Sequence, residues 1–409
     1  MPQADLLLPP APAPPTTPRR GPHSRASGRA GGPNTRAESP PVEPAAVDLL
    51  PDRRWLILRI AAAVAVLGAL VLAVSALPGL GEVRARLADA SPGWLALALL
   101  FEVGSCLACI VTVRAVFCAR LPWRLSYDMG MAAQGTNVLL PAGGAGGLAV
   151  VAWALRRTGM PGERIGRRAV AFFVLTSAVN FSVAVLAGGL LALGILAGGG
   201  ALAFTAGPAI AAAIVMGGVL SLPRLLKSDG LSQPREGRSG RILAAVRGAL
   251  NGGLRDAIAL ARSGNPQVIG GALGYMLFDV AALGAAFVAI GELPPVGVLL
   301  LAYVVGQLGG LIPVPGGVGG ADGGLIAALV LYGTPLAAAA AAVLAYRAFQ
   351  LGLPALLGGL SLARLPGAIE RAPSSGPLCE QHPEAPCGPI ARFPAPRGTI
   401  AVGATSRAA

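Results

Sequence analysis

A glycine- and proline-rich stretch at residues 313–324, P-V-P-G-G-V-G-G-A-D-G-G, constrains this chain most. Its twelve residues include two prolines and six glycines, yet it lies between the apolar runs 296–312 and 325–332. Within a membrane, non-helical backbone is tolerated only where protein or a water-filled cavity covers it. The stretch therefore predicts a broken membrane segment that forms part of a site.

The composition indicates an integral membrane protein of the all-α class. The chain has 409 residues, of which 54% are hydrophobic and 12% charged, and several apolar runs exceed the length of a membrane-spanning helix. The net charge of +13 is explained by basic residues that flank such helices on the cytoplasmic side. No basic run alternates with aromatic residues, so we expect no nucleic-acid partner.

The charge pattern predicts a protein of the cell (inner) membrane with about six full spans. Both of its termini are expected in the cytoplasm. The spans are expected at residues 55–77, 94–118, 169–193, 202–222, 267–290 and 336–360. They form a membrane domain over residues 53–365, between disordered tails at 1–52 and 366–409. In the basic cytoplasmic loop 223–266, residues 242–261 form either an interfacial amphipathic helix or a solvated linker.

Two further apolar segments are interrupted and are predicted to form hairpins. The first has basic residues on both flanks, so it enters and leaves from the cytoplasm; the second has none and is entered from outside. The first hairpin's arms, about 24 and 21 Å long, fall short of the roughly 30 Å hydrocarbon core, which favours a re-entrant hairpin over two full spans. The breaks centre on Pro141, Gly143 and Gly144, and on Pro313, Pro315, Gly316 and Gly317.

The two hairpins match each other at a constant offset of 174 residues. Gly135 pairs with Gly309 and Pro141 with Pro315, and the G-x-P that ends the first hairpin pairs with the G-x-P at Gly333. The same offset relates the halves 94–193 and 267–365, whose flanking charges give them opposite orientations. An inverted repeat with broken elements in matching positions predicts a transporter-like site at the bilayer midplane.

Three motifs resemble the flippase-like transmembrane region of lysylphosphatidylglycerol synthases. They are N-V-L-L-P-A-G-G-A-G-G from Asn137, I-P-V-P-G-G-V-G-G-A-D from Ile312, and L-A-Y-R-A-F-Q-L-G-L-P from Leu344. Two shorter stretches also match, R-R-T-G-M-P from Arg156 and Y-G-T-P from Tyr332, and the resemblance covers about residues 54–364. The resemblance implies a membrane protein that binds or moves a lipid. The chain departs from the family at Leu148, where an acidic residue and an Arg are common, and at Asp322, where Glu is usual. No aminoacyl-transferase domain follows residue 364, so we expect no lipid-aminoacylating activity.

Arg347, halfway along the last span, is the strongest candidate site residue, and it matches the family's Arg. A charge at that depth costs at least about 2.5–3.5 kcal/mol and is usually functional or paired. Asp322 and Asp279 are its candidate partners. The alternatives are an Arg–Asp pair that only fixes helix packing and a contact with an anionic headgroup. Asp322 could also serve only to complement the dipole of the helix it begins.

The remaining polar residues in the apolar segments are weaker candidates. Glu102 is either a proton-linked group or part of the wall of a polar cavity. The amides could each bond to adjacent broken backbone; they are Gln134, Asn137, Asn180 and Gln307. Cys379, His382 and Cys387 are too few ligands for a closed zinc site, so we expect no metal, and nothing indicates a cofactor.

These observations predict a protein that binds or translocates an anionic phospholipid or lipid-linked substrate. Half-helices that begin near Gly143 and Gly317 would direct their positive dipole ends inward and favour an anion. The alternative is an accessory subunit that presents a lipid-linked substrate to a separate glycosyl- or aminoacyl-transferase. An intramembrane enzyme is disfavoured, because no catalytic motif is found. We expect the second hairpin to be the more functional of the two.

Overall fold

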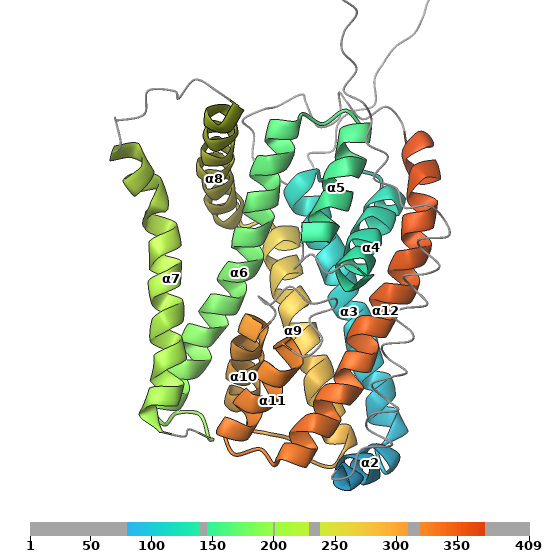
Figure 1. The fold of residues 1–409 in the computed structure, drawn as a ribbon, viewed down its shortest axis with the longest axis vertical. Coiled ribbons are helices and arrows are strands. Elements are labelled where there is room, and N and C mark those ends of the chain that lie inside the picture. The colour runs from blue at the N-terminus through green and yellow to red at the C-terminus, as the bar shows by residue number, and fades with distance from the viewer. Residues whose placement is uncertain (1–79, 140–144, 199–200, 229–237, 310–319, 373–409) are drawn as a thin grey trace, which may run out of the picture. The chain divides into compact units, whose positions relative to one another are not determined.

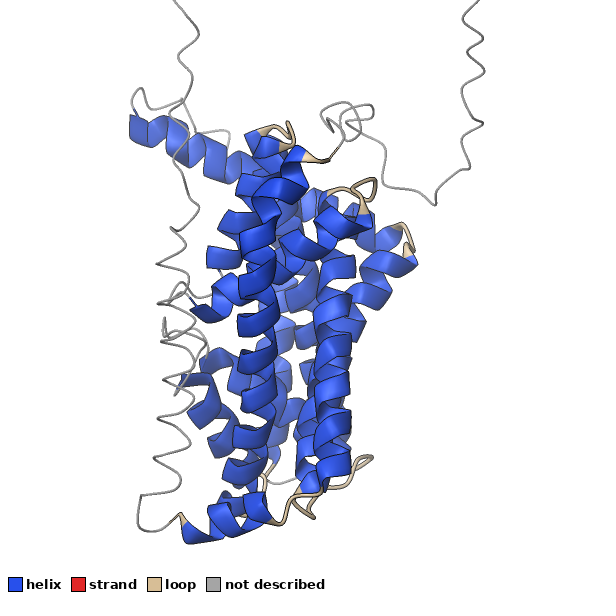
Figure 2. Ribbon diagram, turned by 90° about the vertical axis from the view of Figure 1, so that its right-hand side faces the viewer, coloured by secondary structure: helices blue, strands red, loops and turns tan. Residues whose placement is uncertain are grey.

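A computed structural model describes residues 80–139, 145–198, 201–228, 238–309 and 320–372. This part of the chain is helical, without strands, and Figure 2 colours every regular element as helix. Five of its helices are long and apolar enough to cross a membrane: α3 (Pro92–Phe117), α6 (Gly162–Ala192), α7 (Leu202–Ser228), α9 (Pro266–Ala289) and α12 (Leu336–Glu370). The all-α membrane fold is therefore confirmed. The first expected span, at residues 55–77, lies outside the described residues.

The two hairpins are present as pairs of short helices. The first pairs α4 (Trp123–Leu139) with α5 (Ala145–Arg157), and the second pairs α10 (Val296–Gly309) with α11 (Gly320–Leu331). None of the four reaches the roughly 20 residues that a spanning helix needs, which agrees with re-entrant hairpins. The break residues Pro141, Gly143, Gly144, Pro313, Pro315, Gly316 and Gly317 lie outside the described residues.

The helix boundaries follow the 174-residue repeat closely. Helix α3 begins at Pro92 and α9 at Pro266, while α6 begins at Gly162 and α12 at Leu336, so both pairs start 174 residues apart. In Figure 1, α6 and α12 run in opposite directions along the bundle, and the α4–α5 and α10–α11 hairpins occupy opposite halves of it. The repeat is therefore inverted in space as well as in the charge pattern.

Both hairpins end in the same glycine turn. Gly159 and Gly333 have φ of 89° and 91°, a left-handed conformation that favours glycine. Behind each glycine, a backbone N–H bonds back to the helix at 3.0 Å, from Met160 to Leu155 and from Thr334 to Leu329. The proline that follows each turn then caps the next long helix. The repeated G-x-P therefore encodes a repeated helix–turn–helix connection.

Each hairpin packs against a long helix of the other repeat: α4 lies against α12, and α10 lies against α6. Helices α4 and α12 approach most closely where Gly135 faces Gly358. A Cβ added to Gly135 would lie 2.7 Å from the Cα of Gly358 and 2.7 Å from the carbonyl oxygen of Pro354. Two glycines thus allow backbone contact, and this close crossing joins the two halves.

The structure decides between the two alternatives for residues 242–261. Residues 242–261 are not a solvated linker but lie within α8 (Arg238–Arg262), whose Leu254, Ala257 and Leu260 are buried. Helix α8 packs on α6, and Asp256 forms an ion pair with Arg167 at 2.7 Å. Helix α8 is amphipathic because its apolar residues gather on one face. Part of that face is covered by α6.

Three regions differ from expectation. A short helix, α2 (Gly81–Ala88), occurs in the loop before α3, and its Arg86 bonds to Glu292 at 2.8 Å, which raises the pKa of Arg86. Helix α6 begins at Gly162 instead of residue 169. Helix α12 continues to Glu370, past the expected end of the span at residue 360 and into the expected tail. Polar residues next to a span can continue its helix, because leaving the membrane does not by itself end the backbone hydrogen bonding.

Candidate functional site

Asp279 is the centre of a polar cluster inside the bundle. It lies midway along α9 and is 4% exposed. Its carboxylate accepts hydrogen bonds from the hydroxyl of Tyr346 at 2.8 Å, from the hydroxyl of Tyr303, and from the amide of Gln350 at 3.2 Å. Because a buried carboxylate is costly unless donors surround it, these three side chains from α10 and α12 stabilise it.

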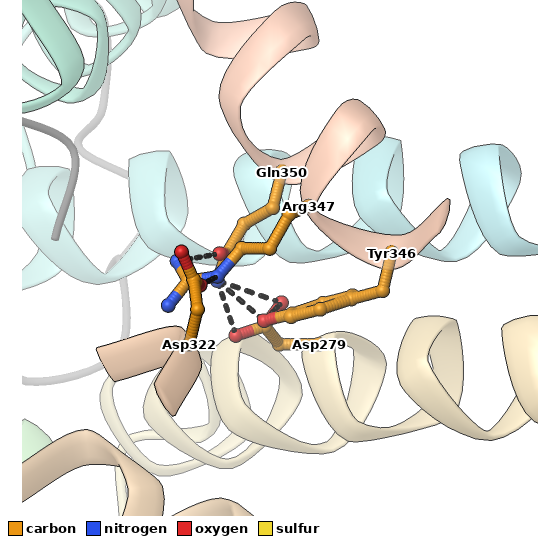
Figure 3. A network of polar contacts seen from close by, with 5 residues as sticks. All are labelled: Asp279, Asp322, Tyr346, Arg347 and Gln350. Carbon is orange, nitrogen blue, oxygen red and sulfur yellow. Dashed lines mark hydrogen bonds and ion pairs between the residues drawn. The ribbon is translucent and has the colours of Figure 1, made fainter. Parts of the chain in front are cut away.

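Arg347 and Asp322 form an ion pair next to Asp279. Arg347 also donates from Nη1 to the side-chain oxygen of Gln350, and its guanidinium lies 5.9 Å from the centre of the Tyr346 ring. Figure 3 shows Gln350 between the ion pair and Asp279. The amide of Gln350 therefore connects the two parts of the site, since it accepts from Arg347 and donates to Asp279.

The local helix geometry explains why these residues meet. Helix α12 carries Tyr346, Arg347 and Gln350. Gln350 follows Tyr346 by four residues and Arg347 by three, so it is one turn from both. Asp322 is in the first turn of α11, directly after the second glycine-rich break. The turn at 332–335 folds α12 back against α11, which brings the start of α11 to the middle of α12.

Glu102 extends the cluster onto α3. It is 3% exposed and accepts a hydrogen bond from the Cys106 thiol at 3.8 Å, and its carboxyl group lies near that of Asp279. Its Oε2 has no donor among the described residues. Two buried carboxyl groups that lie close together repel each other when both are ionised. We therefore expect Glu102 and Asp279 to share a proton.

The amide candidates divide between the cluster and the backbone. Gln307 lies one turn after Tyr303 on α10 and is itself exposed, so it extends the cluster toward the surface. Gln134 donates to the carbonyl of Cys106 at 3.3 Å, and Asn137 accepts from the backbone N–H of Gly147 at 2.7 Å. Gln134 therefore bonds to the backbone of α3, and Asn137 bonds α4 to α5 within the first hairpin. Asn180 lies on α6, which supplies no side chain to the cluster described above.

Three members of the cluster were not predicted from the sequence: Tyr303, Tyr346 and Gln350. A helical-face argument could have found the last two, because they lie within one turn of Arg347 on the same span. Tyr303 carries a hydroxyl within the otherwise apolar run 296–306. A buried tyrosine usually finds a hydrogen-bond partner, so this hydroxyl was also a usable signal.

Among its described residues, the first repeat carries no equivalent cluster. At the offset of 174 residues, Arg347 corresponds to Phe173, Asp322 to Leu148 and Asp279 to Ser105. The Ser105 hydroxyl donates to the carbonyl of Tyr275, which leaves it outside the polar network. The two halves of the inverted repeat therefore share their backbone arrangement but not their polar side chains. Most of the side chains in the cluster belong to the second half.

The comparison with known protein families agrees with this architecture. Residues 57–358 match the family model described as "Lysylphosphatidylglycerol synthase TM region", which covers more than half of the chain. No curated protein matches the chain. The matched residues contain both hairpins, the inverted repeat and the whole polar cluster. The chain therefore belongs to the family of the lysylphosphatidylglycerol synthase transmembrane region, and it is a membrane protein of the flippase-like type.

Proposed function

We propose that this protein binds the headgroup of an anionic phospholipid or lipid-linked substrate at Arg347 and carries it across the membrane. The observation that supports this most directly is the ion pair between Arg347 and Asp322 at the start of a broken helix. Arginine presents a rigid fork of N–H groups that matches a phosphate oxygen pair. A guanidinium held inside an apolar bundle is the group expected to select such a ligand.

In this proposal Asp322 is a resident counter-ion that the ligand displaces. The side chains of Arg347 and Asp322 are 11% and 19% exposed, so the pair is largely but not wholly covered. An incoming phosphate would take the place of the Asp322 carboxylate, while Gln350 and Tyr346 keep the guanidinium in position. The exchange preserves the charge balance around Arg347, which lowers the cost of leaving it buried.

The inverted repeat supports movement as well as binding. Transporters with this architecture place their site where broken helices meet and alternate access by moving one repeat against the other. Here the cluster lies at the inner start of α11, and each hairpin rests on a long helix from the opposite repeat. A rocking motion of the halves would therefore open the Arg347 site toward one leaflet at a time.

The test is translocation of labelled lipids by the purified protein in liposomes. We expect the wild type to move labelled phosphatidylglycerol, and Arg347→Gln to abolish this movement while the protein remains folded. Arg255→Gln is the matched control, because it removes an exposed arginine on α8 outside the cluster. Equal translocation by Arg347→Gln and wild type would overturn the proposal.

The same experiment separates transport from an accessory role. If the protein binds anionic lipid through Arg347 but does not move that lipid across the membrane, the proposal that it translocates lipid is wrong. Presentation of a lipid-linked substrate to a separate transferase would then be the better explanation. Co-purification of such a transferase with the wild-type protein, but not with a variant that no longer binds lipid, would support that role.

A further inference from the structure

A second polar site lies at the opposite end of α12 from the hairpin turn. There, the beginning of α4 and the end of α12 border an open cavity of about 550 Å³, lined by Trp123, Arg124, Tyr127, Asp128, Arg364 and Arg371. Arg364 is 17 residues from Arg347 along the same helix, or about 25 Å at 1.5 Å per residue. The cavity is therefore separate from the polar cluster around Asp279.

The lining of this cavity carries an excess of positive charge. Three arginines face one carboxylate, and none of the three makes an ion pair with a described residue. Asp128 lies near Arg364 and Ser361 of α12, so its single carboxylate offsets part of this charge and a positive excess remains. Arg371 donates from Nε to the Gly367 carbonyl at 2.6 Å, which leaves its terminal nitrogens available. The cavity is thus built to take an anion.

Two aromatic side chains form the part of the rim that α4 supplies. Trp123 and Tyr127 are 53% and 37% exposed, and they lie one turn apart on α4. The Arg114 guanidinium lies 4.2 Å from the centre of the Trp123 ring and holds the indole in place from beneath. Tryptophan and tyrosine concentrate at the membrane–water interface, where one end of the side chain is apolar and the other wet. This aromatic rim is the kind of surface expected at the depth of lipid headgroups.

Two exposed leucines precede the cavity residue Arg364 on α12. Leu356 and Leu360 are 61% and 47% exposed, and they lie eight and four residues before Arg364 on α12. Residues at this spacing share one face of a helix. An acyl chain laid along these leucines would bring its phosphate to Arg364. A free phosphate has no apolar part that could contact the leucines. The ligand that fits both the arginines and the leucines is therefore a lipid.

We propose that this cavity is a binding site for one anionic phospholipid at the basic, membrane-surface end of the bundle. The arginines Arg124, Arg364 and Arg371 hold the phosphate, Trp123 and Tyr127 border the headgroup, and Leu360 and Leu356 support an acyl chain. The site does not depend on transport through the Arg347 cluster. It would hold a lipid even if the central site bound none.

Lipid binding to the purified full-length chain in neutral-lipid nanodiscs tests this site. The probes are phosphatidylglycerol, phosphatidylcholine and glycerol phosphate, counted as bound molecules by native mass spectrometry. We expect Arg124→Gln/Arg364→Gln to weaken phosphatidylglycerol binding about tenfold or more, since it removes two charge-assisted contacts. Arg255→Gln should leave binding unchanged, and Arg347→Gln should leave this bound lipid in place. Unchanged affinity in the double variant, or glycerol phosphate binding as tight as phosphatidylglycerol, would overturn the proposal.

A fluorescence measurement locates the lipid without removing any arginine. Phosphatidylglycerol with brominated acyl chains quenches a tryptophan that it contacts, so it should quench wild-type emission more than brominated phosphatidylcholine does. The excess quenching should disappear in Trp123→Phe and persist in Trp153→Phe. Circular dichroism and gel filtration confirm that each variant is folded. Excess quenching that survives Trp123→Phe would place the lipid elsewhere and refute the site.

Discussion

Arg347 and Asp279 lie in one cluster without forming an ion pair, because the amide of Gln350 stands between them. The Gln350 oxygen accepts from Arg347, and its nitrogen donates to Asp279 at 3.2 Å. A neutral bridge leaves Arg347 paired with Asp322 alone, while Asp279 is held by hydroxyl and amide donors. Arg347 can therefore exchange Asp322 for another anion without disturbing the Asp279 carboxylate.

Replacing Gln350 tests this bridge. We expect Gln350→Leu to lower the free energy of unfolding by about 1–3 kcal/mol, because it leaves buried polar partners without a hydrogen bond. It should also weaken selection of anionic lipid, because the guanidinium loses its support. Thermal unfolding in detergent measures the first effect and lipid binding the second. Thr176→Val is the matched control at the equivalent position on α6, where the hydroxyl bonds only to its own helix. A Gln350→Leu protein as stable and selective as the wild type would show that the bridge has no role.

A double-mutant cycle on Arg347 and Asp322 distinguishes pairing from binding. Asp322→Asn or Arg347→Gln alone should destabilise the protein by about 3–5 kcal/mol, because each leaves the other charge without its partner. The combined variant should recover much of that stability, giving a coupling energy well beyond the additivity error of about 0.5 kcal/mol. It should not recover anionic-lipid binding. Recovery of both properties would mean that the pair serves packing only.

The sequence predicted the path of the backbone much better than it predicted the site. The charge pattern and the offset of 174 residues were enough to place both hairpins and to invert the repeat, since both depend on residues spread along the whole chain. Arg347 and Asp322 were found because a charge in an apolar segment is conspicuous. Tyr303 and Gln350 were missed because uncharged polar residues are common in membrane helices, and their importance comes from contact with Asp279 across three helices.

Helix ends were the other source of error. The apolar part of α12 ends near residue 360, but the helix continues through Arg364 to Glu370. Hydropathy marks where a helix leaves the hydrocarbon, whereas hydrogen bonding and capping decide where the helix ends. The cavity between α4 and α12 depends on this extra length, because Arg364 and Arg371 follow the expected end of the span. No pattern in the separate segments indicated that they would meet there.

Glu102 offers a test of the shared proton. Glu102→Gln should fold with nearly wild-type stability, because an amide can donate to Asp279 as a protonated carboxyl group does. Glu102→Ala should lower the unfolding free energy by about 2–4 kcal/mol, since it removes that donor and leaves a cavity. Thermal unfolding of both variants measures the difference. If Glu102→Gln is the less stable of the two, a charged Glu102 is required and the shared proton is refuted.

The contact between Gly135 and Gly358 determines whether α4 can lie against α12. A Cβ on Gly135 would sit 2.7 Å from the Gly358 Cα, and one on Gly358 would sit 2.5 Å from the Gly135 Cα. Because the nearest atoms are backbone on both sides, neither helix can yield by turning a side chain. We expect Gly135→Ala to cost about 1–3 kcal/mol through overpacking, and Gly135→Leu to prevent the native packing of the first hairpin. Gly189→Ala is the control, because nothing lies within 4 Å of its added Cβ and alanine favours a helix. Thermal unfolding and limited proteolysis of the hairpin report the effect. If Gly135→Ala is as stable as Gly189→Ala, the two helices are not in backbone contact in the folded protein.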